Sequence, residues 1–250
     1  MGTTRFAYTN KLESATILNA PSADAVLVAA NSKNGQRYIP WRSAAGPPSP
    51  VDIEFDLGSA QAVTIAALLN IPPVVIGGST TQITSVAVES ASAAGGPWTN
   101  RATITPAGLT DIGAVFASQT FRYWRFRLTN NGIFSVGELW LGVVQQDIGM
   151  QFAPGTIKGH RKNRSRVESA AGLKQSFYHS RNLHQWSLNY ETATDAMRAS
   201  LDDVFQQRKF ILFIDENDTF YQVEHQEDAW GAAVIFDNIH DSRFVIEELV

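Results

Sequence analysis

All five histidines, the residues best suited to proton transfer or metal binding near neutral pH, lie in the second half of the chain. Their spacing matches no metal motif, since His179 and His184 are five residues apart and the chain has no cysteine. Acidic residues crowd one turn at Asp215, Glu216 and Asp218, where they either hold a cation or form a solvated hairpin tip. There is no phosphate loop, nucleophile elbow or dinucleotide fingerprint. The sequence therefore predicts a protein that is not an enzyme and that holds no metal and no cofactor.

Length and composition indicate a globular protein. A chain of 250 residues suits one large or two ordinary domains, and this one is 44% hydrophobic and 18% charged. Because cysteine is absent, stability must come from packing rather than from disulfides. No window approaches the roughly 18 apolar residues that a membrane-spanning helix needs. Residues 1–8 also lack the apolar core of a signal peptide. We therefore expect a soluble protein made in a cytosol, without membrane insertion.

Short apolar runs separated by turn residues dominate the first 145 residues. The run RYWRFRL at residues 122–128 alternates with a period of two, as in a strand with one buried face. Turns rich in glycine, proline and asparagine separate such runs. This spacing predicts an antiparallel β-sandwich or jelly roll. The expected strands are residues 25–29, 51–57, 63–69, 84–90, 121–128 and 137–143.

A second unit with a different pattern begins near residue 155. We place the boundary so that the domains are residues 1–148 and 149–250. One helix is expected to start at Thr194 as N-cap, with Met197, Leu201, Val204 and Phe205 on its apolar face. The expected strands of this unit are residues 166–171, 175–178, 184–190, 210–214, 220–225, 232–236 and 244–249. The predicted fold is therefore mainly β, a jelly roll followed by an α+β domain in which one helix covers a sheet.

Charge is distributed unevenly along the second unit. Residues 158–181 carry seven basic side chains and one acidic one, for a net charge of +6, whereas residues 182–250 carry four basic and fourteen acidic, for a net charge of −10. A positive segment and a negative body could attract each other between copies and favour a head-to-tail ring. Alternatively, the basic segment folds back on its own domain or stays solvated. The acidic remainder argues against binding of nucleic acid.

The start of this basic segment, from residue 158 to 166, is expected to be a long loop, and loops of that length usually serve function or contact. It is our candidate for the interface between copies. The side chains expected there are Lys158, Arg161, Lys162, Arg164 and Arg166.

Several short motifs follow one another in the first unit. Asn34-Gly35 precedes the run IPWRS at residues 39–43, a strand then ends in Asp-Leu-Gly at residues 56–58, and GGPWT follows at residues 95–99. The last motifs are the strand at 122–128 and the run GELWLG at 137–142. In this order they resemble the discoidin, or coagulation-factor type C, family. That resemblance implies a galactose-binding-like jelly roll over residues 31–142, a fold whose sugar-binding members are carbohydrate-binding modules.

The resemblance also raises the question of a structural calcium ion. Many members of that family bind calcium through three positions, which are Asn34, Ile39 and Glu138 in this chain. An isoleucine side chain offers no ligand, whereas calcium takes roughly six to eight oxygens, including carboxylates. This departure argues against a calcium site.

Sugar sites place an aromatic plane against the ring and polar groups around it, because the C–H faces stack while the hydroxyls need hydrogen-bond partners. For each candidate the alternative is a turn cover or a domain interface. Trp41 is expected in the core instead, and Trp124 and Trp140 in the core or at a subunit contact. The turn residues expected to bind sugar are Arg37, Tyr38, Trp98, Asn130, Asn131 and Phe134.

The second unit resembles bacteriophage tail proteins of the tail-tube and distal-tail type, which assemble as rings. The resemblance rests on an aromatic-x-Leu-x-aromatic strand at 186–190 and a Leu and Phe pair at Leu201 and Phe205. It also rests on a compact strand at 209–215 and an apolar, Glu-containing end at 244–249. The resemblance implies a homo-oligomer, either a trimer or a hexamer.

Together these patterns predict a structural protein of a phage tail tip or baseplate, assembled in the host cytoplasm and located in the virion. Its second domain would form the ring, and its jelly roll would face outward to dock other tail proteins or host glycans. The alternative is a bacterial carbohydrate-binding protein in which the second domain is an accessory module. Oligomeric state separates the two, since the alternative predicts a monomer or dimer.

Overall fold

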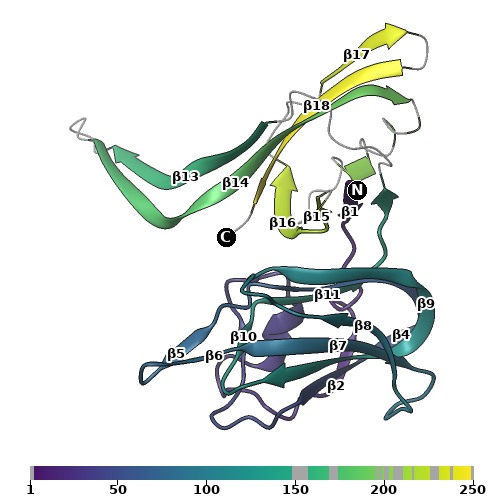
Figure 1. Ribbon diagram of the computed structural model, residues 1–250, viewed down its shortest axis with the longest axis vertical. Coiled ribbons are helices and arrows are strands. Elements are labelled where there is room, and N and C mark those ends of the chain that lie inside the picture. Colours follow the sequence, from purple (N-terminus) through teal and green to yellow (C-terminus); the bar gives the residue numbers. More distant parts are fainter. Residues whose placement is uncertain are drawn as a thin grey trace.

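The structure is a computed structural model. It describes residues 3–147, 157–168, 174–194, 196, 199, 203–204, 211–215, 217–225, 231–236 and 239–248. Strands make up nearly all the regular structure of these residues, which confirms the expected mainly β fold. The strands form a jelly-roll part, drawn in the lower half of Figure 1, and a second, larger sheet, drawn in the upper half. No helix in the described part is long and apolar enough to cross a membrane.

The jelly roll is built on a six-stranded antiparallel sheet with the order β11-β4-β9-β7-β8, in which β2 also pairs with β4. Two short pairs, β10 with β3 and β5 with β6, complete it. Its strands are β2 (Thr16–Asn19), β3 (Trp41–Arg42), β4 (Val51–Leu69), β5 (Val74–Ile76), β6 (Ser79–Thr81), β7 (Ile83–Ala91), β8 (Thr99–Ile104), β9 (Ile112–Asn130), β10 (Ser135–Val136) and β11 (Glu138–Gly142).

Two long strands, β4 and β9, pass through both layers of the sandwich (Figure 1). Their pairing shifts register between Asp56 and Gln61, where the paired strands bend. Residues 51–57 of β4 pair with the second half of β9 in what we call the outer layer, which also holds β7 and β8. Residues 61–69 pair with the first half of β9 and with β11 in the inner layer. Buried side chains of both layers, such as Phe55 and Leu68, share one apolar core.

The strands expected at 51–57 and 63–69 are thus two halves of one strand, because residues 58–60 bend the strand without ending it. The strand expected at 25–29 is wrong, since this stretch turns and leads into the 3-10 helix η1 (Ala29–Lys33). The physical reason is Asp24, whose carboxylate accepts hydrogen bonds from the backbone N–H groups of Val26 and Leu27. Those bonds close a turn and leave Val26 exposed.

The second sheet has eight strands, ordered β12-β1-β15-β16-β18-β14-β13 with β17 on β18. They are β1 (Arg5–Ala7), β12 (Gln146–Asp147), β13 (Ile157–Glu168), β14 (Lys174–Thr194), β15 (Ile211–Ile214), β16 (Phe220–His225), β17 (Gly231–Phe236) and β18 (Ile239–Glu248). The strand β1 pairs with both β12 and β15, so the chain starts in this sheet, leaves it to form the jelly roll, and returns through β12. The domain division at residue 148 stays a prediction, although β1 pairs with β15 of the second unit and β12 joins the same sheet through β1.

The start of the basic segment, residues 158–166, is a strand and not the expected loop. It lies in β13, which pairs along its length with β14 and ends the strand order of the sheet. Basic side chains are common on such edge strands, because charge discourages uncontrolled pairing. The helix expected from Thr194 falls mostly outside the described residues; within it, residues 196, 199, 203 and 204 have helical backbone. Asp215 accepts hydrogen bonds from the N–H groups of Asn217 and Thr219, as expected of a hairpin tip.

An apolar cluster joins the inner layer of the jelly roll to the second sheet. Ile65 and Trp140 contribute from the jelly roll, and Leu212 and Phe220 from the second sheet. Gly113 of β9 permits this contact, because a Cβ there would lie 2.5 Å from a ring carbon of Phe220 and 2.8 Å from the carbonyl oxygen of Ala66. In the inner layer, β11 and residues 65–69 of β4 are therefore buried on both faces, while the outer layer keeps one face away from the second sheet.

Candidate functional site

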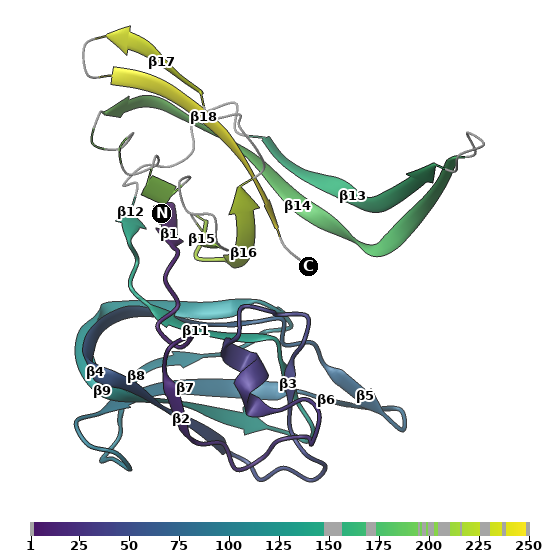
Figure 2. The ribbon, with the colours of Figure 1, turned by 180° about the vertical axis from the view of Figure 1, so that it is seen from behind.

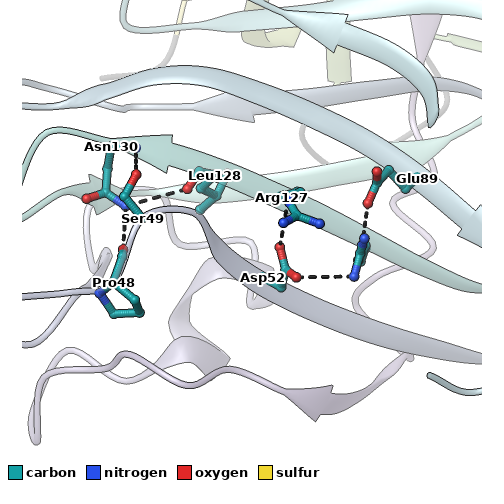
Figure 3. Close-up of polar contacts among 8 residues, drawn as sticks. Pro48, Ser49, Asp52, Glu89, Arg127, Leu128 and Asn130 are labelled. Carbon is teal, nitrogen blue, oxygen red and sulfur yellow. Dashed lines mark hydrogen bonds and ion pairs between the residues drawn. The ribbon is translucent and has the colours of Figure 1, made fainter. Parts of the chain in front are cut away.

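The structure distributes the six predicted sugar-binding residues over different surroundings. Phe134 is fully buried and packs edge-on against Trp41, with ring centroids 5.2 Å apart, so it belongs to the core and cannot stack on a ligand. The sequence predicts Phe134 to be exposed on a turn because it follows Asn131 and Gly132, which are typical turn residues. Asn130 is also buried, and its side-chain amide donates to the carbonyl of Pro48 over 3.0 Å, which fixes the turn before β4 (Figure 3).

Arg37 is a buried member of an ion pair. Its Nη2 donates to both carboxylate oxygens of Asp111, at 2.8 and 3.0 Å, and the two side chains are only 4% and 6% exposed. The remaining guanidinium nitrogens, Nε and Nη1, are buried without a hydrogen-bond partner in the described part of the protein. Asn70 completes the cluster, since its backbone N–H donates to Asp111 over 2.7 Å and its side chain donates to the Arg37 carbonyl over 2.8 Å.

These contacts gather several loops at one end of the jelly roll, which we call the loop end: residues 34–40, 70–73, 106–111 and 131–137. Gly137 lies against the first of them, because a Cβ there would come within 2.3 Å of the Arg37 carbonyl oxygen. The backbone N–H of Ile71 donates to the Thr110 carbonyl over 2.9 Å. The loop end is therefore held by hydrogen bonds between segments that are distant in the sequence.

Tyr38 stands on this fixed support with its ring exposed. Tyr38 is 66% exposed, and no other aromatic residue among residues 3–147 is exposed to a comparable degree. Leu109, from a neighbouring loop, is also exposed. Asn131 lies at the same end, where its side-chain oxygen accepts from the N–H of Gln82 over 2.7 Å. An exposed ring on a fixed loop is the arrangement that sugar C–H faces require.

Trp98 lies elsewhere, on the exposed side of the outer layer. Its ring is covered on one side by the Arg125 guanidinium, 4.7 Å from the ring centroid. Around Arg125 the neighbouring strands place carboxylates, with Asp52 from β4 and Glu89 from β7 (Figure 3). We call this group, together with Arg127, the open face. The alternation of residues 122–128 already indicates that Arg125 and Arg127 share one side of a strand, whereas their acidic partners are not apparent from the sequence.

The position that holds calcium in the discoidin family does not fit a cation in this chain. Glu138 is buried, and its two carboxylate oxygens accept hydrogen bonds from the side-chain amide of Asn10, at 2.9 Å, and from the N–H of Gly35, at 3.1 Å. Each carboxylate oxygen thus already accepts from a donor, and Ile39 brings no side-chain oxygen. No group of three or more metal-binding side chains occurs among the described residues. Burial raises the pKa of Glu138 to about 8, despite the opposing effect of these two hydrogen bonds.

The residues predicted at an interface between copies, Lys158, Arg161, Lys162, Arg164 and Arg166, all lie on β13. The pairing of β13 with β14 shifts register between Lys162 and Arg164, so a bulge interrupts the regular alternation of side chains there. The structure thus places them on one edge strand of the second sheet.

Comparison with known proteins finds similarity to solved carbohydrate-binding modules over about half of the chain. A chitosan-binding module 1 from a chitosanase/glucanase of Paenibacillus sp. IK-5 is 24% identical, with 54% of this chain and 98% of that chain covered and a TM-score of 0.43. The family 32 module of C. perfringens NanJ in complex with galactose is 18% identical, with 54% and 98% covered and a TM-score of 0.44. The family 32 module of AlyQ in complex with 4,5-unsaturated mannuronic acid is 23% identical, with 54% and 95% covered and a TM-score of 0.39.

Modules of this discoidin-like, galactose-binding type are the kind that the first part of the sequence resembles. No family model matches the chain, and no curated protein matches it. No comparison supports the resemblance of the second unit to phage tail proteins.

Proposed function

We propose that this protein binds carbohydrate through the loop end of its jelly roll, with Tyr38 as the surface on which a sugar ring stacks. The observation that carries this proposal is an exposed ring on a loop that a buried ion pair holds in place. Because Arg37 and Asp111 are ordered before a ligand arrives, little conformational entropy is lost when it binds.

Replacing Tyr38 with alanine is expected to weaken sugar binding at least about tenfold, or ~1.4 kcal/mol, because the stacking surface is lost. Galactose and chitotriose, which are named for solved structures similar to this chain, serve as probes in isothermal titration calorimetry. Tyr38→Phe keeps the ring and is expected to retain binding. Val75→Ala, a change at another exposed apolar side chain, is the matched control. Undiminished binding by Tyr38→Ala would place the sugar away from the loop end.

A second candidate function is the ring-forming part of a phage tail tip or baseplate, in which the jelly roll faces outward to dock tail proteins or host glycans. The observation that favours it is the position of β13, which ends the strand order and carries five basic residues. A strand with one unpaired backbone edge can pair with another chain, and the acidic remainder of the second unit provides opposite charge.

Reversing the charges at Arg161, Lys162 and Arg164 is expected to weaken such an assembly and to reduce its sensitivity to salt. Light scattering at two salt concentrations measures the mass of the wild-type and variant proteins. A threefold or sixfold wild-type particle that loosens with salt is the expected result for this candidate. A salt-independent monomer would favour carbohydrate binding alone, and an assembly unchanged by charge reversal would exclude β13 from the interface.

A further inference from the structure

The open face lies on the side of the jelly roll that the second sheet leaves uncovered. The apolar cluster shared with the second sheet involves the inner layer, whereas Asp52, Glu89, Arg125 and Arg127 stand on strands of the outer layer. Their alternation with buried neighbours, such as Phe126, directs them away from the core. A ligand can therefore approach this surface without displacing the second sheet.

Hydrogen bonds within the open face are distributed unequally between its two arginines. Arg125 is nearly buried, its Nε donates to Glu89, and its Nη1 donates to Asp52 over 3.1 Å. Arg127 is 42% exposed and approaches Asp52 only to 3.8 Å, too far for a hydrogen bond. The Asp52 oxygen nearest to Arg127, Oδ1, is buried without a hydrogen-bond partner in the described structure (Figure 3). Arg125 thus forms hydrogen-bonded ion pairs with Asp52 and Glu89, whereas the ion pair of Arg127 with Asp52 has no hydrogen bond.

An incomplete pair of this kind suits a hydroxyl group. A hydroxyl donates one hydrogen bond and accepts others, so it can accept from the exposed Arg127 guanidinium while it donates to the part of the Asp52 carboxylate that is exposed, since Oδ1 itself is buried. A carboxylate on the ligand would be repelled by Asp52 and Glu89, and an ammonium group would be repelled by Arg125 and Arg127. Two carboxylates balance the two guanidinium groups of the open face, and Glu54, which pairs opposite Arg125 on β4, adds a third carboxylate to the same side of the sheet. This surface therefore has no positive charge in excess with which to attract an anionic ligand.

Trp98 provides an apolar surface beside these polar groups. Its indole is held between the Arg125 guanidinium and Gly96, where a Cβ would lie 2.9 Å from the ring. Gly96 has a φ of +102°, which further disfavours any side chain at that position. The ring is only partly buried, so a fixed aromatic edge remains beside the hydroxyl-binding pair.

From this arrangement we propose that the open face is a second binding surface, separate from the loop end, that takes a neutral, hydroxyl-rich chain such as a neutral oligosaccharide. Asp52 and Arg127 would bind one hydroxyl between them, and Trp98 would contact an adjacent C–H face. The loop end and the open face would then contact different parts of one polysaccharide, or two separate chains. The inference relies on the proposed function only for the class of ligand.

The test uses three oligosaccharides of equal length in calorimetry with the full chain: a neutral galactan fragment, an anionic galacturonan fragment and a cationic chitosan fragment. The background is Tyr38→Ala, which removes the loop-end contribution. In that background we expect the neutral chain still to bind, and Arg127→Ala or Trp98→Ala to weaken it at least tenfold. Arg122→Ala is the matched control, because Arg122 is an exposed arginine of the same strand with its own partner, Asp56.

The outcomes separate this inference from the proposed function. Loss of all binding in Tyr38→Ala alone overturns the second surface and leaves the loop-end site standing. Tighter binding of the anionic or cationic chain overturns the neutral class. A wild-type protein that binds none of the three overturns both proposals. If Trp98→Ala changes the mass in light scattering and not the sugar affinity, the open face contacts a second copy instead.

Discussion

Replacing Asp111 with alanine is expected to destabilise the protein by roughly 3–5 kcal/mol, because it leaves the Arg37 guanidinium buried without its counter-charge. The same substitution removes the acceptor for the backbone N–H of Asn70, which lies 2.7 Å away. The loops that meet at the loop end then lose their common support. Urea denaturation followed by circular dichroism gives the change in the free energy of unfolding.

Two control variants separate charge from shape. Asp111→Asn keeps the shape but removes the charge, so it is expected to cost less than Asp111→Ala. The double variant Arg37→Met with Asp111→Leu removes the whole pair, and buried pairs replaced by apolar groups often lose little stability. We expect the double variant to be more stable than Asp111→Ala. A cost below about 1 kcal/mol for Asp111→Ala, which is the usual value for an exposed pair, would show that the pair is solvated.

Stability is expected to fall by roughly 3–5 kcal/mol between about pH 5 and pH 9 because of Glu138 alone. The unfolded carboxyl loses its proton near the ordinary pKa of 4.5, whereas in the folded protein burial raises the pKa to about 8. Between these values the folded state binds more protons, so the free energy of unfolding decreases as pH rises. The stabilising contribution of the protonated group is complete below the lower value and is lost above the higher one. Thermal unfolding across this pH range measures the effect.

Glu138→Gln is the control for this titration, since it cannot lose a proton. The variant should show a flatter pH dependence of stability. Its free energy of unfolding should be about 1 kcal/mol lower, because the side-chain NH2 group of glutamine would face the N–H of Gly35 and that hydrogen bond would be lost. Neither calcium nor a chelator should change the unfolding temperature of the wild type. A rise of stability from pH 5 to pH 8 attributable to Glu138, or stabilisation by calcium, would contradict our account of this position.

The sequence predicts three of the strand segments of the outer layer, at residues 51–57, 84–90 and 121–128, because each has one buried and one exposed face, but it misses β8. Alternation in residues 51–57 and 121–128 is a direct consequence of that burial. It cannot show that residues 58–60 bend a strand without ending it, since the same small residues also form turns. The role of β1 is equally hidden, because a strand of three residues is too short to show a period.

The candidate site is predicted less completely than the fold, because its partners come from distant parts of the chain. Arg37 and Tyr38 are identified from their residue types in a turn. Asp111, which determines that Arg37 is buried, lies 74 residues further along the sequence. Glu89 and Asp52 reach Arg125 only through the pairing of three strands. Local patterns therefore identify the aromatic groups and miss the carboxylates that position them.

The path of the chain through β1 and β12 determines how a mechanical force would be transmitted between the jelly roll and the second sheet. The segments that enter and leave the jelly roll are paired side by side, with Arg5 opposite Asp147 and Phe6 opposite Gln146. A single flexible connector would let the jelly roll swivel, whereas two hydrogen-bonded strands share tension and resist twisting (Figure 2). Insertions into a parent fold are tolerated where the ends of the inserted part lie close together. The jelly roll is thus connected to the second sheet through two paired strands, β1 and β12. A different domain inserted between these two strands would leave the register of the second sheet unchanged.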